Sequence, residues 1–171
     1  ISPLQSLMKD QVDNLIKKTT LKNSAALYGM LTPPERFQLL EDIRLGIIGL
    51  LYISPEQLRS LAFKKAIMHR DIAAWVFDEA HCLSKWGHDF RPDDLYVSRF
   101  IREFAEEQGV LDLAPIFCYT ATAKMDVQAE IVEHFETELN ISMKVLDGGA
   151  ERSNLKFIVE NKNTVAKLER L

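Results

Sequence analysis

The chain has 171 residues, of which 47% are hydrophobic and 27% are charged. These proportions are typical of a folded globular domain, and they exclude a disordered chain, a collagen-like repeat and a small disulfide scaffold. Lys and Arg total 21 against 25 Asp and Glu, which gives a net charge of -4. No overall basic field therefore attracts nucleic acid, and any such contact must be local.

The two ends and the apolar runs bear on the cellular context. The chain begins at Ile1 rather than Met and ends on the apolar-periodic stretch 165–171, so we expect an excerpt of a longer protein. The longest apolar run, residues 47–53, is far shorter than the roughly 20 residues that span a bilayer. Cys82 and Cys118 occur without other secretory features, which predicts two reduced thiols and a cytoplasmic or nuclear protein.

Helix signals recur along the chain. Three predicted helix starts share a hydroxyl N-cap followed by Pro, with Glu or Gln at the third helical position: Ser2, Thr32 and Ser54. The second of these helices is predicted to stop at Gly46. A fourth is expected from Pro92 to Gly109, and a fifth from about Lys124. Their inward residues are predicted from helical spacing to be Phe100, Ile101 and Phe104, then Val127, Ile131, Phe135 and Leu139.

Short apolar runs without polar alternation lie between these helices. They occupy residues 49–53, 72–77, 115–119, 143–146 and 155–159. Such runs are typical of strands that are buried on both faces, so the chain is predicted to be an α/β domain with a mostly parallel sheet. Ligands bind such sheets at the carboxyl ends of the strands, which directs attention to the residues that follow each run.

Two adjacent acids, Asp78 and Glu79, directly follow the run at residues 72–77. Paired carboxylates at the exit of a buried strand are costly unless they hold a cation or move a proton. Phosphoryl transfer uses such a pair, with Asp78 holding Mg²⁺ and Glu79 orienting and deprotonating the attacking water. The alternative is that Asp78 caps a following helix. His81 and His88 lie nearby, but their spacing fits no zinc motif.

Two further segments follow strand exits. Residues 81–92 hold two large aromatics and two cations beside Gly and Pro, a combination that suits stacking on unpaired bases and contact with phosphates. The alternative is that Trp86 and Phe90 pack beneath their loop. Thr120-Ala121-Thr122 offers two hydroxyls at another strand exit, and an N-cap role for Thr122 is its alternative.

Taken together, these segments resemble the superfamily-two helicases and, within them, the RecQ family. Four stretches are similar to helicase motif Ia, to the next DNA-facing motif, to motif II and to motif III: Ile1–Gln11, Tyr52–Glu56, Asp78–His81 and Thr120–Ala123. His81–Pro92 is similar to the aromatic-rich loop that is specific to RecQ helicases. Glu151–Leu155 is similar to the segment that joins the first RecA-like lobe to the second. The resemblance covers nearly the whole chain.

The resemblance implies a three-layer RecA-like domain from a 3′-to-5′ DNA helicase that is powered by ATP hydrolysis. Residues 1–147 would form most of the first lobe, and residues 148–171 the inter-lobe linker and the start of the second. No Gly is followed by Lys, so the phosphate loop G-x-x-x-x-G-K-[ST] is absent. We therefore expect a lobe that is incomplete at its N-terminus and does not unwind DNA by itself.

The resemblance also implies roles for individual residues, with ATP and Mg²⁺ as cofactors. Asp78 is the expected Mg²⁺ ligand and Glu79 the catalytic base. Residues expected to couple hydrolysis to lobe movement are His81, Thr120, Ala121 and Thr122. Expected DNA contacts are Ser2 and Pro3, at the N-terminus of a capped helix where N–H groups can hold a phosphate, and the sensor residues Trp86, His88, Phe90 and Arg91.

The expected partners are single-stranded or forked DNA and the second RecA-like lobe of the same protein, with no membrane. The expected location is cytoplasmic and nucleoid-associated in a bacterium, or nuclear in a eukaryote. Two alternatives remain at this point. A non-catalytic nucleic-acid-binding or scaffold domain would have no use for the Asp78–Glu79 pair, and a two-metal nuclease would need further acids at other strand exits.

Overall fold

The computed structural model describes residues 1–84, 92–110, 112–121 and 124–146, without the side chains of residues 92–95. In this part of the chain the helices are α1 (Gln5–Lys18), α2 (Pro33–Arg44), α3 (Leu61–Ile67), α4 (Pro92–Gln108) and α5 (Met125–Leu139), with the short 3₁₀ helices η1 (Pro55–Arg59) and η2 (Ala80–Leu83). The strands are β1 (Ser24–Leu27), β2 (Leu50–Ile53), β3 (Trp75–Phe77) and β4 (Ile116–Cys118).

The strands form two parallel pairs, β1 with β2 and β3 with β4. The first two residues of the chain bridge these pairs. Ser2 donates its N–H to the Ile53 carbonyl at the end of β2 (3.0 Å), and the Ile1 carbonyl accepts from Asp78 N–H just beyond β3 (2.9 Å). The carboxyl ends of all four strands therefore lie along one edge, and the predicted parallel α/β arrangement is confirmed.

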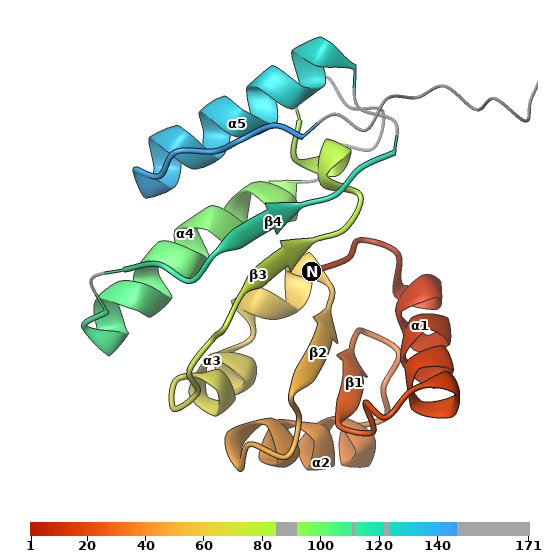
Figure 1. Cartoon of the computed structure of the whole chain (residues 1–171). Coiled ribbons are helices and arrows are strands. Elements are labelled where there is room, and N and C mark those ends of the chain that lie inside the picture. The colour runs from red at the N-terminus through yellow and green to blue at the C-terminus, as the bar shows by residue number, and fades with distance from the viewer. Residues whose placement is uncertain (85–91, 111, 122–123, 147–171) are drawn as a thin grey trace, which may run out of the picture.

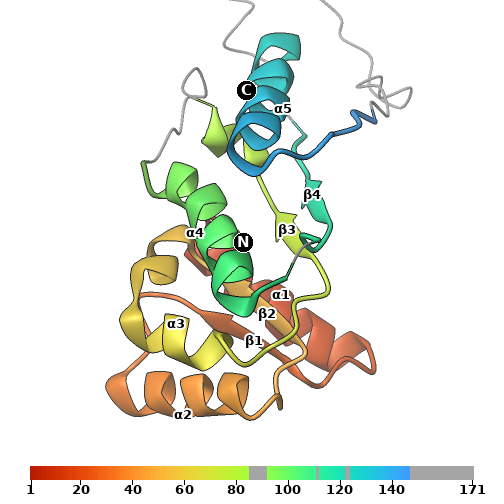
Figure 2. The same ribbon diagram turned by 90° about the vertical axis from the view of Figure 1, so that its left-hand side faces the viewer.

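Helices cover the strands from two sides. Figures 1 and 2 place α3 and α4 on one side and α1 on the other. The buried residues of α1, Met8 and Val12, lie outside the main hydrophobic cluster, as expected for a helix on the opposite face. Over β3 and β4, the described helices α4 and α5 cover one face, whereas Val76 and Phe117 on the other face are 43% and 46% exposed.

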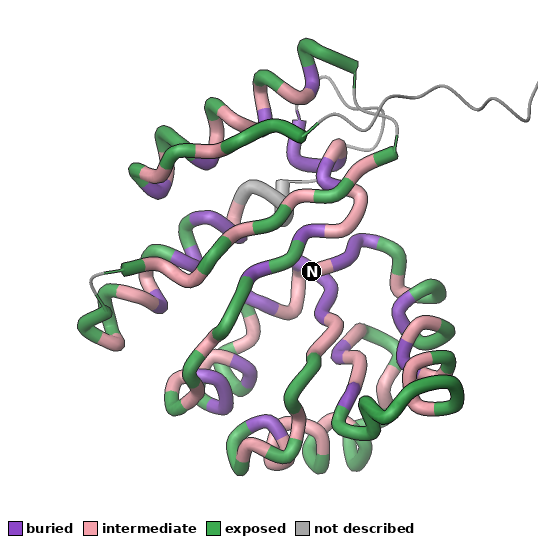
Figure 3. Tube along the Cα trace, in the orientation of Figure 1, coloured by how far each residue is buried: buried purple, intermediate pink, exposed green. Residues whose placement is uncertain are grey.

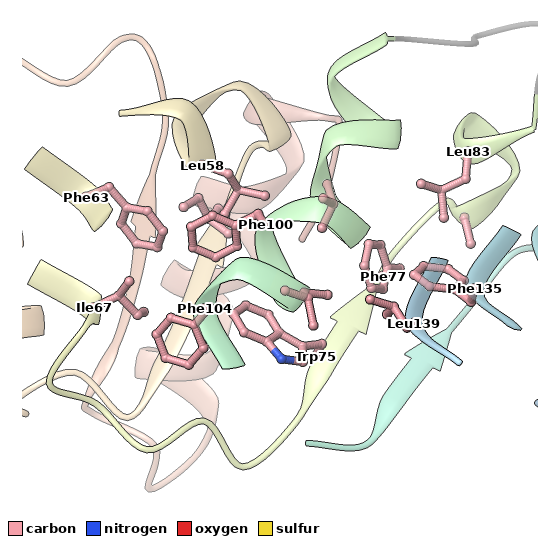
Figure 4. Packing of buried hydrophobic residues seen from close by; sticks show 14 of the residues in the cluster. Leu58, Phe63, Ile67, Trp75, Phe77, Leu83, Phe100, Phe104, Phe135 and Leu139 are labelled. Atoms are coloured by element: carbon pink, nitrogen blue, oxygen red, sulfur yellow. The ribbon is translucent and has the colours of Figure 1, made fainter. Parts of the chain in front are cut away.

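The main core runs from the β1–β2 pair, η1, α2 and α3 across to β3, α4 and α5. Trp75 and Phe77 point to the same face because successive strand residues alternate. Trp75 meets the rings of Phe100 and Phe104 edge-on at 6.0 and 5.9 Å, and Phe77 meets Phe135 at 5.0 Å, as Figure 4 shows. Burying one such aromatic side chain contributes about 1.5–3 kcal/mol. In Figure 3, by contrast, α2 is largely exposed or half-buried.

Of the three predicted helix starts, the one at Thr32 is confirmed. Thr32 and Glu35 form a capping box, and the helix ends just before Gly46, whose positive φ of 78° suits glycine. The start at Ser2 is wrong, because α1 begins at Gln5 with Leu4 as its N-cap. At Ser54 the chain forms the short η1 instead, and the α-helix starts later with Ser60 as its cap.

Most of the other predicted elements are confirmed. The fourth and fifth helices occur as α4 and α5, and their predicted inward residues are buried. The strand predicted at residues 143–146 is wrong, since Met143 donates its N–H to the Glu136 carboxylate of α5 rather than to a strand. The apolar run at 155–159 and the proposed boundary at residue 148 lie outside the described residues.

The two thiols match their expected state. Cys82 and Cys118 are both free. Cys118 lies at the end of β4, and burial raises the pKa of its thiol to about 12. Within the described residues, no helix has the length and apolar character needed to cross a bilayer.

Candidate functional site

The exit of β3 holds the acidic pair in a fixed turn. Glu79 donates its N–H to Asp78 Oδ1 (3.0 Å), and Asp78 donates its own N–H to the Ile1 carbonyl. Glu79 has φ 50° and ψ 45°, a left-handed conformation that costs a non-glycine residue about 1–2 kcal/mol. The hydrogen bond from Ala80 N–H to the Tyr119 carbonyl (2.9 Å) anchors the next residue to the exit of β4. The two carboxylates have separate contacts, Asp78 with Glu79 N–H and the Ser2 hydroxyl, and Glu79 with His81.

A chain of side-chain contacts joins this turn to the exit of β4. Glu79 Oε2 lies 3.3 Å from His81 Nδ1, and the same nitrogen lies 3.1 Å from Thr120 Oγ1. His81 belongs to η2 and Thr120 follows β4, so two loops that are 39 residues apart meet on one imidazole. His81 therefore links the Glu79 carboxylate to the loop after β4.

Asp78 lies among oxygen-bearing side chains. The Ser2 hydroxyl is 3.4 Å from Asp78 Oδ2. Burial, and then the negative charge of Asp78, raise the pKa of the Tyr52 phenol, so this β2 side chain lies within the field of the carboxylate. Carboxylate and hydroxyl oxygens suit Mg²⁺, which binds through one or two carboxylates while phosphates and waters fill its other positions. The described residues contain no cluster of three or more His, Cys, Asp or Glu side chains able to hold a metal. This donor set therefore fits Mg²⁺ shared with a phosphate.

The exits of β1 and β2 carry a second polar cluster. Glu56 Oε1 accepts from Gln5 Nε2 (2.6 Å) and from Ser54 Oγ (2.7 Å), and Ser54 is fully buried. A Cβ on Gly29, in the loop after β1, would lie 3.7 Å from Gln5 Oε1. The first turn of α1 and the turn after β2 are thus held together, and the loop after β1 lies beside Gln5. We call Gln5, Ser54 and Glu56 the Glu56 brace.

The predicted site residues are partly brought together. The structure joins Asp78, Glu79, His81 and Thr120 in one site, with Ala121 exposed beside it. The expected setting of Ser2 and Pro3 is wrong in its geometry. Both residues are buried, Ser2 N–H is bonded to Ile53, and neither residue is part of α1. The other predicted residues lie outside the described part of the chain, namely Thr122, Trp86, His88, Phe90 and Arg91.

Sequence reasoning missed three features of the site. It did not place Tyr52 near Asp78, did not bring the Ser2 hydroxyl to the same carboxylate, and did not identify the Glu56 brace. For Tyr52, Ser54 and Glu56 the available signal was the rule that strand exits share one edge, because these residues lie in β2 or directly after it. Which side chains pair across that edge depends on tertiary contacts.

Comparison with known proteins identifies the family. A model of the DEAD/DEAH box helicase family matches residues 1–131. The chain is 34% identical over 166 residues to the ATP-dependent DNA helicase RecQ of Haemophilus influenzae. The matched region covers 95% of this chain and 24% of that protein. It is 35% identical to the ATP-dependent DNA helicase RecQ of Bacillus subtilis, over 95% of this chain and 26% of that protein.

A eukaryotic relative shows the same relationship. The chain is 37% identical to the ATP-dependent helicase SGS1 of Saccharomyces cerevisiae, over 96% of this chain and 11% of that protein. The chain thus spans about a quarter of the length of the bacterial relatives it matches. The family match includes the acidic pair and the His81–Thr120 contact described above. The chain therefore belongs to the DEAD/DEAH box helicase family, as a member of its RecQ group.

Proposed function

We propose that this chain forms part of an ATP-dependent DNA helicase of the RecQ type, which hydrolyses ATP to move 3′-to-5′ along single-stranded DNA and separate duplexes. The observation that carries the proposal is the contact chain from Glu79 through His81 to Thr120. A binding module gains nothing from an acidic pair that would face phosphate. A motor needs both the pair and a link from it to a second loop.

The acidic pair has a division of labour in this proposal. Asp78, beside the Ser2 hydroxyl, holds Mg²⁺. When bound, Mg²⁺ neutralises charge on the phosphate oxygens of ATP. Glu79 orients the attacking water and accepts its proton, which a carboxylate does when it lies within hydrogen-bond reach of that water. The separate contacts of the two carboxylates, Asp78 with Ser2 and Glu79 with His81, support this division.

His81 and Thr120 transmit the state of the ATP site in this proposal. The imidazole contacts both the Glu79 carboxylate and the Thr120 hydroxyl, so movement of the loop after β4 alters the surroundings of the base. Ala121 and Thr122 continue that loop in the sequence. The second RecA-like lobe is the proposed partner that moves when ATP is hydrolysed.

DNA binding is assigned to the exits of β1 and β2 and to the aromatic-rich segment. The Glu56 brace supports the first surface, because it holds the first turn of α1 beside the turn after β2. Ser2 and Pro3 form the buried base of this surface. The proposed sensor residues of the aromatic-rich segment are Trp86, His88, Phe90 and Arg91. A DNA substrate implies a nucleoid-associated protein in a bacterium and a nuclear one in a eukaryote.

The test is ATP hydrolysis by the intact protein, measured with and without single-stranded DNA, together with strand separation on duplexes that carry a 3′ or a 5′ tail. We expect DNA to accelerate hydrolysis, and the 3′-tailed duplex alone to be unwound. DNA binding without any hydrolysis would instead favour a scaffold. Cleavage of the DNA in the presence of Mg²⁺ would favour a nuclease.

A further inference from the structure

The inner side of α5 makes three polar contacts with the layer beneath it. Glu130 accepts a hydrogen bond from the Ser84 hydroxyl, and His134 Nε2 lies 2.5 Å from the Ser98 hydroxyl of α4. Arg102 Nη1, also on α4, donates to Glu138 at the far end (3.4 Å to Oε2). These α5 residues are spaced by four, so they share one face of the helix. One contact reaches η2 and two reach α4.

The Ser84 contact differs from the other two in where it lies along the chain. Ser84 is fully buried, caps the C-terminal end of η2, and donates its N–H to the His81 carbonyl (3.2 Å). In the sequence it lies within the stretch His81–Pro92 that is similar to the aromatic-rich loop, two residues before Trp86. Glu130 lies in α5, which begins at Met125 directly after the segment 120–124. The Ser84–Glu130 contact therefore joins the predicted DNA-sensing loop to α5. This helix follows the predicted coupling residues 120–122.

We propose that Glu130 is a positioning residue that transmits DNA binding to the ATP site through Ser84. The inference rests on the proposed helicase function. A hydrogen bond between a hydroxyl and a carboxylate is stronger and more directional than one between neutral groups. The Ser84–Glu130 hydrogen bond fixes the position of Ser84 at the C-terminal end of η2. His81 lies one turn earlier in the same short helix. A signal that reaches Ser84 is therefore passed through η2 to His81, while Glu130 supplies the fixed point.

Apolar contacts already hold α5 in place, so the Ser84–Glu130 contact is not needed for packing alone. Val127, Ile131, Phe135 and Leu139 are buried along the helix, and Phe135 packs on Phe77 of β3. The Arg102–Glu138 contact is more exposed, with both side chains 40% or more accessible. It provides a control far from Ser84, because Glu138→Ala also removes a carboxylate contact between α5 and its neighbour, while Arg102 Nη1 keeps its hydrogen bond to the Glu138 backbone carbonyl (2.9 Å).

The test uses the intact protein and three variants, Glu130→Ala, Ser84→Ala and the control Glu138→Ala. ATP turnover is measured without DNA and across a titration of single-stranded DNA, and thermal unfolding reports whether each variant folds. We expect the ratio of DNA-stimulated to DNA-free turnover to fall about fivefold or more in Glu130→Ala and Ser84→Ala. We expect Glu138→Ala to keep the ratio of the unmodified protein. The double variant Ser84→Ala/Glu130→Ala should be no worse than either single one, because both remove the same contact.

Three outcomes would overturn the inference. The first is an unchanged stimulation ratio in Glu130→Ala or, if that variant does not fold, in Ser84→Ala. The second is an equal loss in Glu138→Ala, which would indicate a general packing effect of α5. The third is additive loss in the double variant. If the unmodified protein shows no stimulation by DNA, the proposed helicase function fails, a result distinguishable from all three.

Discussion

The two pairs of strands end in differently built surfaces. At the exits of β3 and β4, polar groups contact one another, with Glu79, His81 and Thr120 joined in a chain and Ala80 N–H bonded to the Tyr119 carbonyl. At the exits of β1 and β2, the Glu56 brace is buried at Ser54, while apolar side chains nearby in the sequence, Leu4 and Met30, are 42% and 81% exposed.

This difference follows from what each surface is proposed to do. A group that moves a proton needs a fixed position, and the contacts of Glu79 with its neighbours supply one. A surface that binds a long polymer needs a fixed backbone with outward side chains, and the brace holds the turns without occupying those side chains. In this proposal the same strand-exit geometry serves chemistry in one half of the edge and DNA contact in the other.

The largest expected effect is on the β3–β4 exit. Glu79→Gln removes the base but keeps nearly the same shape, so ATP turnover by the intact protein should fall by about 10²–10⁴-fold while nucleotide binding persists. Glu133→Gln, an exposed change on α5, is the control and should turn over normally. Turnover in Glu79→Gln within a few fold of the unmodified protein would show that the base lies elsewhere.

The next effect tests how far the β3–β4 exit depends on the layer of α4 and α5. Phe135 is fully buried against Phe77, so Phe135→Ala should lower the free energy of unfolding by about 3–5 kcal/mol. Phe37 on α2 is 68% exposed, and Phe37→Ala should change it by less than about 0.5 kcal/mol. Denaturant unfolding of the intact protein measures both. An equal loss of unfolding free energy in Phe135→Ala and Phe37→Ala would mean that Phe37 on α2 is covered in the intact protein.

A smaller effect concerns Cys118, at the end of β4. Burial raises the pKa of its thiol from 9.0 to about 12. At pH 8 the thiolate fraction of Cys118 is therefore about a thousandfold smaller in the folded protein than in the unfolded chain. A more basic thiolate reacts faster, which offsets part of this difference. We therefore expect alkylation of the folded protein to be about 50-fold slower than that of the unfolded chain. Mass spectrometry of iodoacetamide-treated protein measures this rate, with guanidinium-unfolded protein as the control. Equal rates would show that β4 is open to solvent.

The same thiol makes stability depend on alkaline pH. A raised pKa means that the folded state holds the proton more tightly than the unfolded chain does. The contribution of the protonated thiol is therefore complete below about pH 9 and is lost as pH rises towards 12. A Cys118→Ala variant should lack this part of the alkaline loss of stability.

Local signals predicted much of the fold. The capping box at Thr32 and the spacing of Val127, Ile131, Phe135 and Leu139 were enough to find α2 and α5, because both depend on neighbours within one or two turns. β1 was missed, since Ser24-Ala25-Ala26-Leu27 contains no β-branched or aromatic residue and Ala is depleted in strands. The α-helix start at Ser2 failed because its hydroxyl lies beside Asp78, a tertiary partner, and the one at Ser54 failed because its hydroxyl donates locally to Glu56 and the chain forms the 3₁₀ helix η1.

The candidate site was predicted in outline. The expectation that Asp78, Glu79 and Thr120 lie at neighbouring strand exits follows from parallel topology, and the structure brings them together. The Glu56 brace, the position of Tyr52 and the Ser84–Glu130 contact could not be predicted, because each joins segments that are far apart in the sequence. Periodicity carries no information about such pairs.

The most direct test of the division between the two surfaces compares Glu79→Gln with Glu56→Ala in the intact protein, each assayed for ATP turnover and for affinity to single-stranded DNA. We expect Glu79→Gln to lose turnover and keep DNA affinity. Glu56→Ala should weaken DNA binding about fivefold and keep its turnover at saturating DNA. Loss of both properties together in both variants would contradict the account, because it would mean that the two strand exits form one functional unit.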